Sequence, residues 1–199
     1  MPSWVPNALT TLRIALLPLW WMQAGACTEA VYFGDDVTSH RWWALVILTV
    51  IGLSDVVDGF VARRFGLASK LGAVLDAAAD KLAQVVMLIY FTFYHGLAFE
   101  PVPLEFFALV ILRDVIMAGG ILAVRMRRGT VQVHHAWHGK VSSLLLFALL
   151  VGITADLDRA WTAPVMWTVA ALIALSTLSY ARDGWRQWRS GPDPAAQDY

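Results

Sequence analysis

Charged residues are scarce in this chain: Asp, Glu, Lys and Arg make up 15% of its 199 residues, where a soluble domain holds about 25%. Apolar residues make up 58%, which leaves too little polar surface for a soluble globular protein and excludes a disordered one. The 15 basic and 15 acidic residues balance, so no nucleic-acid partner is indicated. Cysteine occurs once, as Cys27, which excludes an intrachain disulfide and a cysteine-based zinc site. The remaining class is an integral membrane protein.

Six windows of about 20 largely apolar residues predict an all-α, polytopic protein with six transmembrane helices. They cover residues 6–24, 42–62, 71–94, 104–124, 138–156 and 161–181. Residues 1–189 are expected to form a single six-helix domain, and the polar residues 190–199 a flexible tail. The first twelve residues contain no Lys or Arg, which favours a retained first span over a cleaved signal peptide.

Basic residues predict the orientation of these spans, because six spans place both termini on one side. Nine basic residues lie on that side, against Arg41 and Arg159 in the opposite loops. The positive-inside rule therefore places both termini and the active site on the cytoplasmic side of the cell (inner) membrane. The basic and aromatic run at 182–189 (RDGWRQWR) predicts a helix that lies on anionic lipid. The nine residues are Arg63, Arg64, Lys70, Arg125, Arg127, Arg128, Arg182, Arg186 and Arg189.

Four aspartates lie within the second and third windows: Asp55, Asp58, Asp76 and Asp80. A charge at the centre of a span costs about 2.5–3.5 kcal/mol on insertion scales, so such residues usually face a cavity and have a function. Their spacings of three and four place each pair on one helix face. If the two helices form a hairpin, all four carboxylates meet near the cytoplasmic surface.

Such a carboxylate cluster needs counter-ions, because four negative charges cannot stay ionised in a small, partly dry site. Two divalent cations cancel the charge, and oxygen ligands suit hard ions such as Mg²⁺ or Mn²⁺. A pair of such ions can clamp a diphosphate and stabilise the leaving phosphate. Nearby, Gly59 and Gly72 allow close approach of a ligand, Ala62 allows close helix packing, and Arg63 can bind a phosphate oxygen.

The same residues form the pattern D-x2-D-G-x2-A-R-x8-G-x3-D-x3-D from Asp55 to Asp80. At every fixed position this pattern resembles the signature of the CDP-alcohol phosphotransferase family of integral membrane enzymes. Residues 6–10, with Arg13 and Pro18, are similar to the family's first helix. The resemblance implies a transferase of phospholipid biosynthesis that moves a phosphatidyl group from CDP-diacylglycerol to an alcohol and releases CMP.

The resemblance also implies roles for these residues. Asp55, Asp58 and Asp76 would ligate two Mg²⁺ or Mn²⁺ ions. Asp80 would complete the metal site and act as general base, which makes Asp76 and Asp80 the expected catalytic residues. A homodimer is implied by the resemblance alone. The residues expected to line the CDP pocket are Gly59, Ala62, Arg63 and Gly72.

The acceptor alcohol is the least determined part of the prediction. Arg113 and Lys140 are candidates to bind its anionic group. The segment 138–143 (HGKVSS) resembles the Gly-Lys-x-Lys-Thr segment of glycerophosphate-accepting members, but Ser142 stands where a second Lys is expected. Glycerol 3-phosphate, which gives phosphatidylglycerophosphate, is the leading acceptor. Phosphatidylglycerol, which gives cardiolipin, is the alternative, followed by inositol phosphate or serine.

Several other interpretations of the charged residues stay open. Arg113 can instead pair locally with Asp114, and Arg13 can bind the acceptor or extend to the lipid headgroups. The four aspartates can form an ion-pair network with basic neighbours, or belong to a cation transporter or a non-catalytic membrane scaffold. A further polar cluster consists of His134, His135 and His138. It can be an interfacial loop, a headgroup contact or a metal site.

Overall fold

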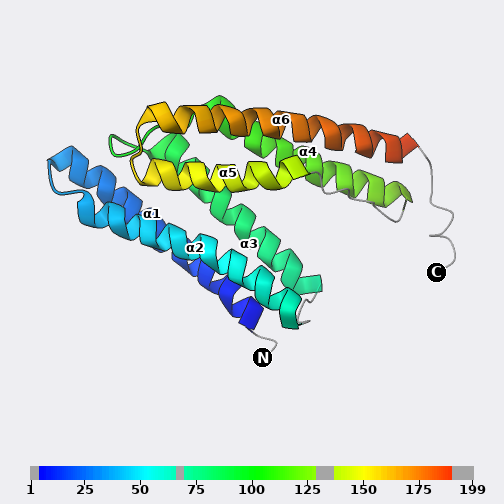
Figure 1. Cartoon of the computed structure of the whole chain (residues 1–199), viewed down its shortest axis with the longest axis horizontal. Coiled ribbons are helices and arrows are strands. Elements are labelled where there is room, and N and C mark those ends of the chain that lie inside the picture. The colour runs from blue at the N-terminus through cyan, green and yellow to red at the C-terminus, as the bar shows by residue number, and fades with distance from the viewer. Residues whose placement is uncertain (1–4, 66–69, 129–136, 190–199) are drawn as a thin grey trace. The chain divides into compact units, whose positions relative to one another are not determined.

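The structure is a computed structural model that describes residues 5–65, 70–128 and 137–189, and within these ranges it contains no strand. For residues 5–9, 55–65 and single positions near 70, 128 and 140, only the helix backbone is described. Each of the six apolar windows overlaps one α-helix, and the third continues into the π-helical turn that follows its helix, so the all-α prediction is confirmed (Figure 1). The elements are α1 (Val5–Phe33), α2 (Thr38–Phe65), α3 (Lys70–Ile89), the π-helical turn η1 (Tyr90–Tyr94), α4 (Leu104–Arg128), α5 (Trp137–Thr154) and α6 (Arg159–Arg189).

Two of these helices are long and apolar enough to cross a membrane by length and composition. They are α4, over Leu104–Arg127, and α6. A shorter apolar helix covers Val141–Thr154 within α5. This criterion covers only the residues that the structure fully describes, and α2 and α3 reach beyond them. The six-span arrangement and its orientation therefore stay predictions.

The chain divides into two compact units. The first comprises Met1–Val102 and Phe147–Thr162, and the second comprises Pro103–Leu146 and Ala163–Tyr199. The boundaries fall inside α5 and α6, so each of these helices contributes to both units.

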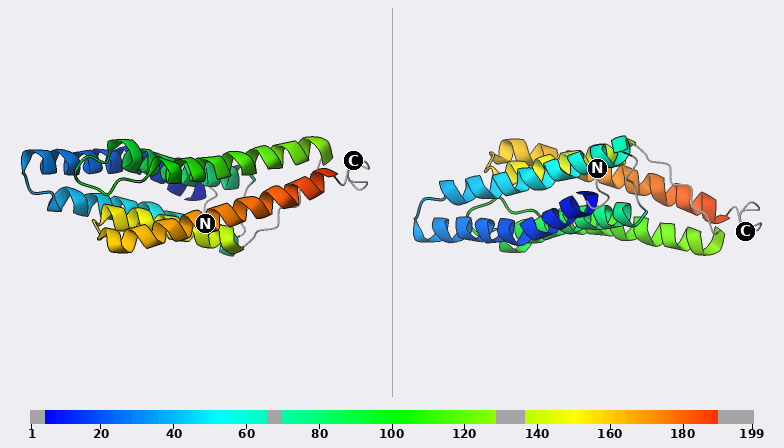
Figure 2. Two further views of the ribbon diagram at one scale, coloured as in Figure 1. Left: turned by 90° about the horizontal axis from the view of Figure 1, so that it is seen from above. Right: turned by 90° about the horizontal axis from the view of Figure 1, so that it is seen from below.

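In the first unit, α1 packs against both α2 and α3. The two views of Figure 2 show α1 and α2 side by side and antiparallel. The core of this unit is aromatic: the ring of Trp20 lies 5.4 Å from Tyr90 and 5.5 Å from Phe91, both in edge-to-face contact. Phe99 closes the cluster at 5.5 Å from Phe91. Edge-to-face pairs add about 0.5–1.5 kcal/mol each beyond the area they bury, so this cluster fixes α1 on the end of α3.

One end of the first unit is closed by polar contacts between loops. Arg41, near the start of α2, pairs with Asp156 at 2.7 Å and donates to the carbonyl oxygen of Ala98 at 2.9 Å. Glu100 accepts a hydrogen bond from Thr162 and pairs with Arg159 at 3.4 Å. The loop after η1 and the α5–α6 turn therefore meet at the start of α2, as expected for loops on one side of a helical bundle.

The connection between α1 and α2 has its own local stabilisation. The Asp36 carboxylate accepts a hydrogen bond of 2.9 Å from the Thr38 amide in the first turn of α2. A hydrogen bond from the Thr38 side chain, together with this backbone hydrogen bond, holds the pKa of Asp36 below its usual value. An acidic side chain here also complements the dipole of α2.

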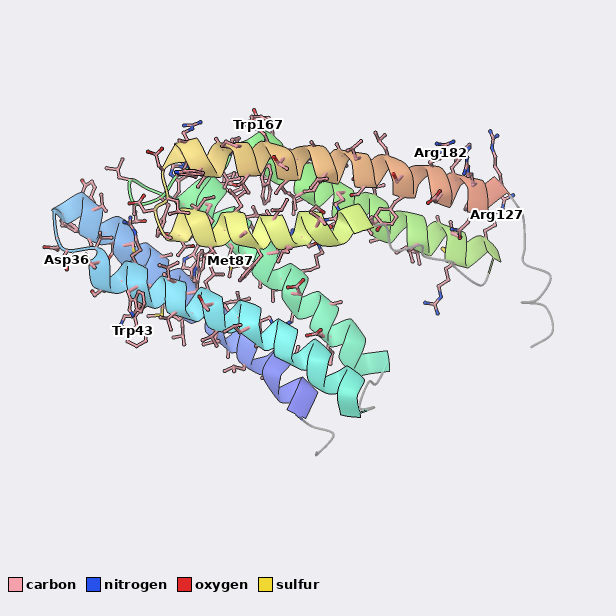
Figure 3. The ribbon with its side chains drawn as sticks, viewed as in Figure 1. Asp36, Trp43, Met87, Arg127, Trp167 and Arg182 are labelled. Atoms are coloured by element: carbon pink, nitrogen blue, oxygen red, sulfur yellow. The ribbon has the colours of Figure 1, made fainter. Side chains whose placement is uncertain are left out.

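In the second unit, α4 and α6 converge toward their C-terminal ends (Figure 2). The guanidinium of Arg127 lies 4.5 Å from the ring centre of Trp188. Figure 3 shows the basic side chains Arg127 and Arg182 at this end. The helix predicted for residues 182–189 is confirmed as the last two turns of α6.

Candidate active site

The eight residues of the signature lie on two helices of the first unit. The backbone of α2 carries Asp55, Asp58, Gly59, Ala62 and Arg63, and α3 carries Gly72, Asp76 and Asp80. Helical geometry over both segments agrees with the sequence prediction, and it places Asp76 and Asp80 one turn apart on one face of α3. The side chains of the five α2 residues lie outside the described part of the structure.

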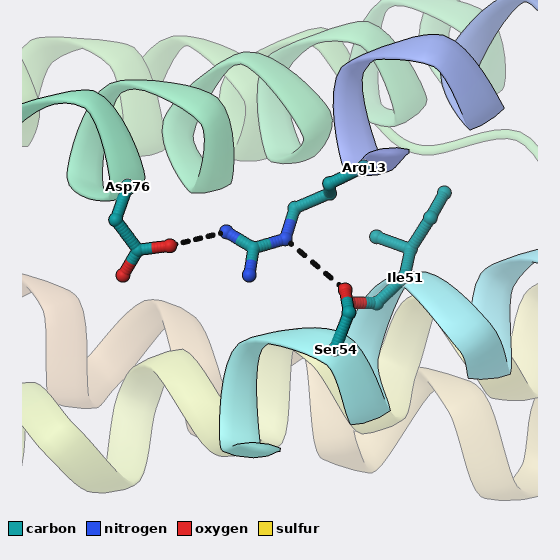
Figure 4. A network of polar contacts seen from close by, with 4 residues as sticks. All are labelled: Arg13, Ile51, Ser54 and Asp76. Carbon is teal, nitrogen blue, oxygen red and sulfur yellow. Dashed lines mark hydrogen bonds and ion pairs between the residues drawn. The ribbon is translucent and has the colours of Figure 1, made fainter. Parts of the chain in front are cut away.

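Asp76 is bound by an arginine from the first helix. Nη1 of Arg13 donates to Oδ1 of Asp76 at 2.9 Å, and Nε of Arg13 donates to the hydroxyl of Ser54 at 3.5 Å (Figure 4). The Ser54 hydroxyl in turn donates to the carbonyl oxygen of Ile51 at 2.7 Å. Arg13 is fully buried, whereas 34% of the Asp76 side chain is exposed. One guanidinium therefore joins α1 to α2 and α3.

This contact corrects one interpretation of Arg13. The sequence leaves open that Arg13 extends to the lipid headgroups, and this is wrong because the side chain is buried and ion-paired. Sequence reasoning missed the pair because Asp76 lies 63 positions further along the chain. The sequence does indicate that Arg13 needs a partner, because it is the one charged residue in the apolar window 6–24.

The other described residues of the signature flank Asp76 on α3. Asp80 lies one turn further along the helix with an exposed side chain, and Gly72 lies one turn before it and is partly buried. The Lys81 ammonium donates to Gln84 at 3.3 Å. Asp76 and Asp80 therefore remain the two described carboxylates of the predicted metal site.

The donor set of this site suits a hard divalent cation, because carboxylate oxygens are the ligands that such ions prefer. Among the described side chains, no three His, Cys, Asp or Glu residues come together as metal ligands. The predicted cluster also requires Asp55 and Asp58, whose side chains are not described, so a four-carboxylate site stays a prediction. His134, His135 and the side chain of His138 also lie outside the described part.

A second polar site lies in the second unit, around Arg113 of α4. Its side chain is 6% exposed, and its Nε has no hydrogen-bond partner in the described part of the chain. Asp114, the local partner considered from the sequence, does not satisfy this atom. A buried N–H without a partner costs about 1–3 kcal/mol, so a ligand that accepts this hydrogen bond would be favoured.

A glycine allows close packing beside Arg113. A Cβ atom placed on Gly139 of α5 would lie 3.1 Å from the hydroxyl oxygen of Tyr180 and 3.8 Å from Nη2 of Arg113. Tyr180 was not singled out from the sequence, since nothing in its spacing on α6 links it to Arg113. Three helices thus bring a guanidinium and a phenol close to the backbone at Gly139, and both groups can donate hydrogen bonds to an anion.

Three polar residues follow Gly139 on α5, and the structure describes the side chains of two of them. The side chain of Lys140 lies outside the described part. Ser142 is buried and donates to the carbonyl oxygen of Gly139 at 3.0 Å, and Ser143 donates to the same oxygen at 3.1 Å. Where a second lysine was expected, the chain therefore has a hydroxyl bonded within its own helix.

Comparison with known proteins identifies the family. The sequence profile of CDP-alcohol phosphatidyltransferases matches residues 3–178. The chain belongs to this family. It is therefore a phosphatidyltransferase of phospholipid biosynthesis, as the signature from Asp55 to Asp80 predicts, and its association with membranes agrees with its composition.

Three relatives illustrate the range within the family. A protein of Mycobacterium tuberculosis (strain ATCC 25618 / H37Rv), named "Putative cardiolipin synthase", is 34% identical over 163 residues, which cover 79% of this chain and 68% of the relative. Two proteins named CDP-diacylglycerol–glycerol-3-phosphate 3-phosphatidyltransferase are each 29% identical. The one from Aquifex aeolicus aligns over 92% of this chain and 96% of its own length, and the one from Escherichia coli (strain K12) over 86% and 84%.

Proposed function

We propose that this phosphatidyltransferase uses CDP-diacylglycerol as donor and glycerol 3-phosphate as acceptor, and that it releases CMP and forms phosphatidylglycerophosphate. The observation that carries the choice of acceptor is the buried Arg113, which lies near Gly139 and whose Nε has no hydrogen-bond partner in the described part of the chain. A compact phosphate fits such a site, because a guanidinium offers a planar set of donors that matches phosphate oxygens. The names of the Aquifex and Escherichia relatives agree with this acceptor.

The reaction joins the acceptor oxygen to the phosphorus that carries the diacylglycerol. The bond from that phosphorus to the CMP phosphate breaks, and CMP leaves with the electron pair. Asp80 takes the proton of the attacking hydroxyl, since a carboxylate within hydrogen-bond reach can act as general base. The net result is one new phosphodiester, free CMP and one proton.

The signature residues are assigned to the donor. Gly59, Ala62, Arg63 and Gly72 line the CDP pocket. Two divalent cations, Mg²⁺ or Mn²⁺, would be held by Asp55, Asp58, Asp76 and Asp80, and when bound they would neutralise the diphosphate and the leaving CMP. Arg13 keeps the Oδ1 oxygen of Asp76 in place.

The acceptor site is assigned to the second unit. Arg113 and Lys140 bind the phosphate of glycerol 3-phosphate, and the Tyr180 hydroxyl donates a further hydrogen bond. Because these groups contact the part of the acceptor that does not react, they act on its binding and orientation.

A cardiolipin synthase that uses phosphatidylglycerol is the second candidate. Ser142 supports this candidate, because it stands where a second lysine was expected. With one cation fewer, the site suits an acceptor phosphodiester with one charge better than a phosphomonoester with two. Of the relatives compared, the mycobacterial protein bears the name of this activity. Inositol phosphate and serine are the remaining acceptors to be tested.

We further propose that the enzyme is a homodimer with six spans in the cell (inner) membrane, with both termini and the active site facing the cytoplasm. The excess of basic residues on one set of loops supports this orientation. The polar contacts of Arg41 with the loop at Ala98 and with Asp156 support the grouping of loops that it requires.

The decisive experiment measures CMP release by the purified full-length protein in detergent with Mn²⁺, CDP-diacylglycerol and each acceptor in turn. We expect glycerol 3-phosphate to raise the rate above that with water, and EDTA to stop release until Mg²⁺ or Mn²⁺ is added back. Asp80→Asn should abolish turnover. Asp35→Asn, a change at an exposed loop aspartate, should not alter it.

The same assay tests the acceptor site. Arg113→Gln should raise the KM for glycerol 3-phosphate by about tenfold or more, because a charged hydrogen bond is lost. Arg182→Gln, a change at an exposed arginine, is the control. A response to phosphatidylglycerol alone would establish the second candidate. Release that is insensitive to EDTA and to Asp80→Asn would overturn the proposed mechanism.

A further inference from the structure

A groove of about 370 Å³ lies between α4 and α6 in the second unit, and of its lining residues the proposed reaction uses only Tyr180. Its volume is in the range of known ligand pockets. The lining is almost wholly apolar and includes Gly120 and Val124 of α4 and Gly184, Trp185 and Trp188 of α6. A Cβ atom added to Gly120 or Gly184 would meet nothing within 4 Å, so these glycines keep the groove open.

Two arginines flank the tryptophans of this groove. Arg127 lies 4.5 Å from the ring centre of Trp188, and Arg189 lies 5.1 Å from that of Trp185. Both arginine side chains are exposed. Stacking on an indole covers one face of a guanidinium but leaves its N–H groups in the plane free to donate. The groove therefore combines an apolar channel with two cations that can hold an anion.

This combination matches one class of molecule. The groove lies between the two helices that are long and apolar enough to cross a membrane. Its arginines stand at the C-terminal ends of both helices, where a membrane-spanning helix meets the headgroups (Figure 3). The carboxylate in its lining, Asp183, disfavours a phosphate deeper in the groove. We propose that the groove holds an acyl chain of an anionic phospholipid whose phosphate is bound by Arg127 and Arg189.

A second copy of the chain suits this surface less well. In a symmetric dimer the same patch faces itself. Arg127 and Arg189 would then approach the same arginines of the second copy. Like charges would be brought together without one carboxylate to balance each arginine. An anionic lipid instead neutralises both arginines.

The test uses phosphatidylglycerol that carries a photoreactive diazirine on its acyl chain, added at low proportion to phosphatidylcholine nanodiscs that hold the full-length protein. After irradiation, mass spectrometry maps the label. We expect it on the α4 and α6 segments that line the groove. The equivalent phosphatidylcholine probe should label them far less. Arg127→Gln and Arg189→Gln should each reduce labelling by phosphatidylglycerol about fivefold, because each arginine stacks on a tryptophan of the groove. Arg182→Gln, at an arginine that the proposal does not use, should leave labelling unchanged.

A matched pair of glycines tests the groove itself. Gly120→Leu should reduce labelling about tenfold, because the new side chain displaces about two methylene groups of the acyl chain. Gly119→Leu is the control, since its Cβ also meets nothing within 4 Å but Gly119 does not line the groove.

Four results would overturn the proposal. They are unchanged labelling in the Gly120→Leu variant, equal labelling by phosphatidylcholine, displacement of the label by CDP-diacylglycerol, and crosslinks between two copies through α4 and α6. Displacement by CDP-diacylglycerol would assign the groove to the donor. The proposed reaction would still stand in all four cases, because CMP release is measured separately.

Discussion

Arg13 links three helices of the first unit through its polar contacts. A buried guanidinium is costly unless hydrogen bonds satisfy it, and here Asp76 and Ser54 accept from it. Since Asp76 is also a proposed metal ligand, Arg13 acts on the metal site through Asp76, as a positioning residue. Its pairing could not be predicted from the sequence, because spacing along one helix cannot indicate a partner on another.

The ion pair predicts a graded effect of changes at Arg13. Arg13→Gln should lower the free energy of unfolding at the lower end of the roughly 3–5 kcal/mol known for broken buried pairs, because a third of Asp76 is exposed. Arg13→Lys keeps the charge but loses the contact to Ser54, and should cost less. Thermal unfolding in detergent with EDTA measures both variants without any contribution from bound metal.

A double-mutant cycle separates the pair from a general effect of burial. In the Asp76→Asn background, Arg13→Gln should cost much less than in the wild type, because the charge that it leaves unpaired is gone. Equal losses in the two backgrounds would show that Arg13 stabilises the helices without the ion pair.

At the scale of elements, one threonine and one glycine position the end of α3 against α1. The Thr28 hydroxyl of α1 shares a hydrogen bond of 3.0 Å with the Tyr90 hydroxyl in η1. Gly96, just beyond η1, has a φ of +57°, and a Cβ atom there would lie 2.1 Å from the Cγ2 atom of Thr28. Both the backbone conformation and the space at this position therefore require glycine.

Gly96→Ala should destabilise the protein more than Gly34→Ala. Gly34 also has a positive φ, +77°, but a Cβ atom there meets nothing within 4 Å. Gly34→Ala should cost about 1–2 kcal/mol for the left-handed conformation, and Gly96→Ala should add the clash with Thr28. Thermal unfolding of the two variants gives the difference. An equal loss would show that the contact with Thr28 relaxes freely.

The sequence predicts elements better than their ends or their partners. All six apolar windows fall on helices, because a run of about 20 apolar residues identifies a helix even though it does not fix where the helix ends. The first helix continues to Phe33 rather than residue 24, and the last to Arg189 rather than 181. Both helices continue because neither segment contains a proline that would end a helix. Tyr180 and Gly139 meet through tertiary packing, which no spacing indicates.

For the whole molecule, the charge distribution predicts which end of α4 faces the cytoplasm. Leu104 and Met126 lie at opposite ends of this helix, 57% and 80% exposed. In intact cells, a membrane-impermeant maleimide should label Leu104→Cys from outside, and Met126→Cys only after the membrane is permeabilised.

The native thiol does not interfere with this measurement, because Cys27 is buried and is the one cysteine of the chain. Wild-type protein should stay unlabelled on both sides. Labelling of Met126→Cys in intact cells would reverse the proposed orientation and place the basic residues outside.

The distance along the chain between Arg13 and Asp76 has a consequence for biogenesis. In the proposed six-span arrangement, α1 leaves the ribosome 63 residues before its carboxylate partner. At about 5–20 residues per second, this separation amounts to roughly 3–13 s. For that time the guanidinium has no Asp76 to pair with, and an unpaired arginine is disfavoured in lipid. The first helix is therefore expected to wait at the insertion machinery, or at the membrane surface, until α3 has been made.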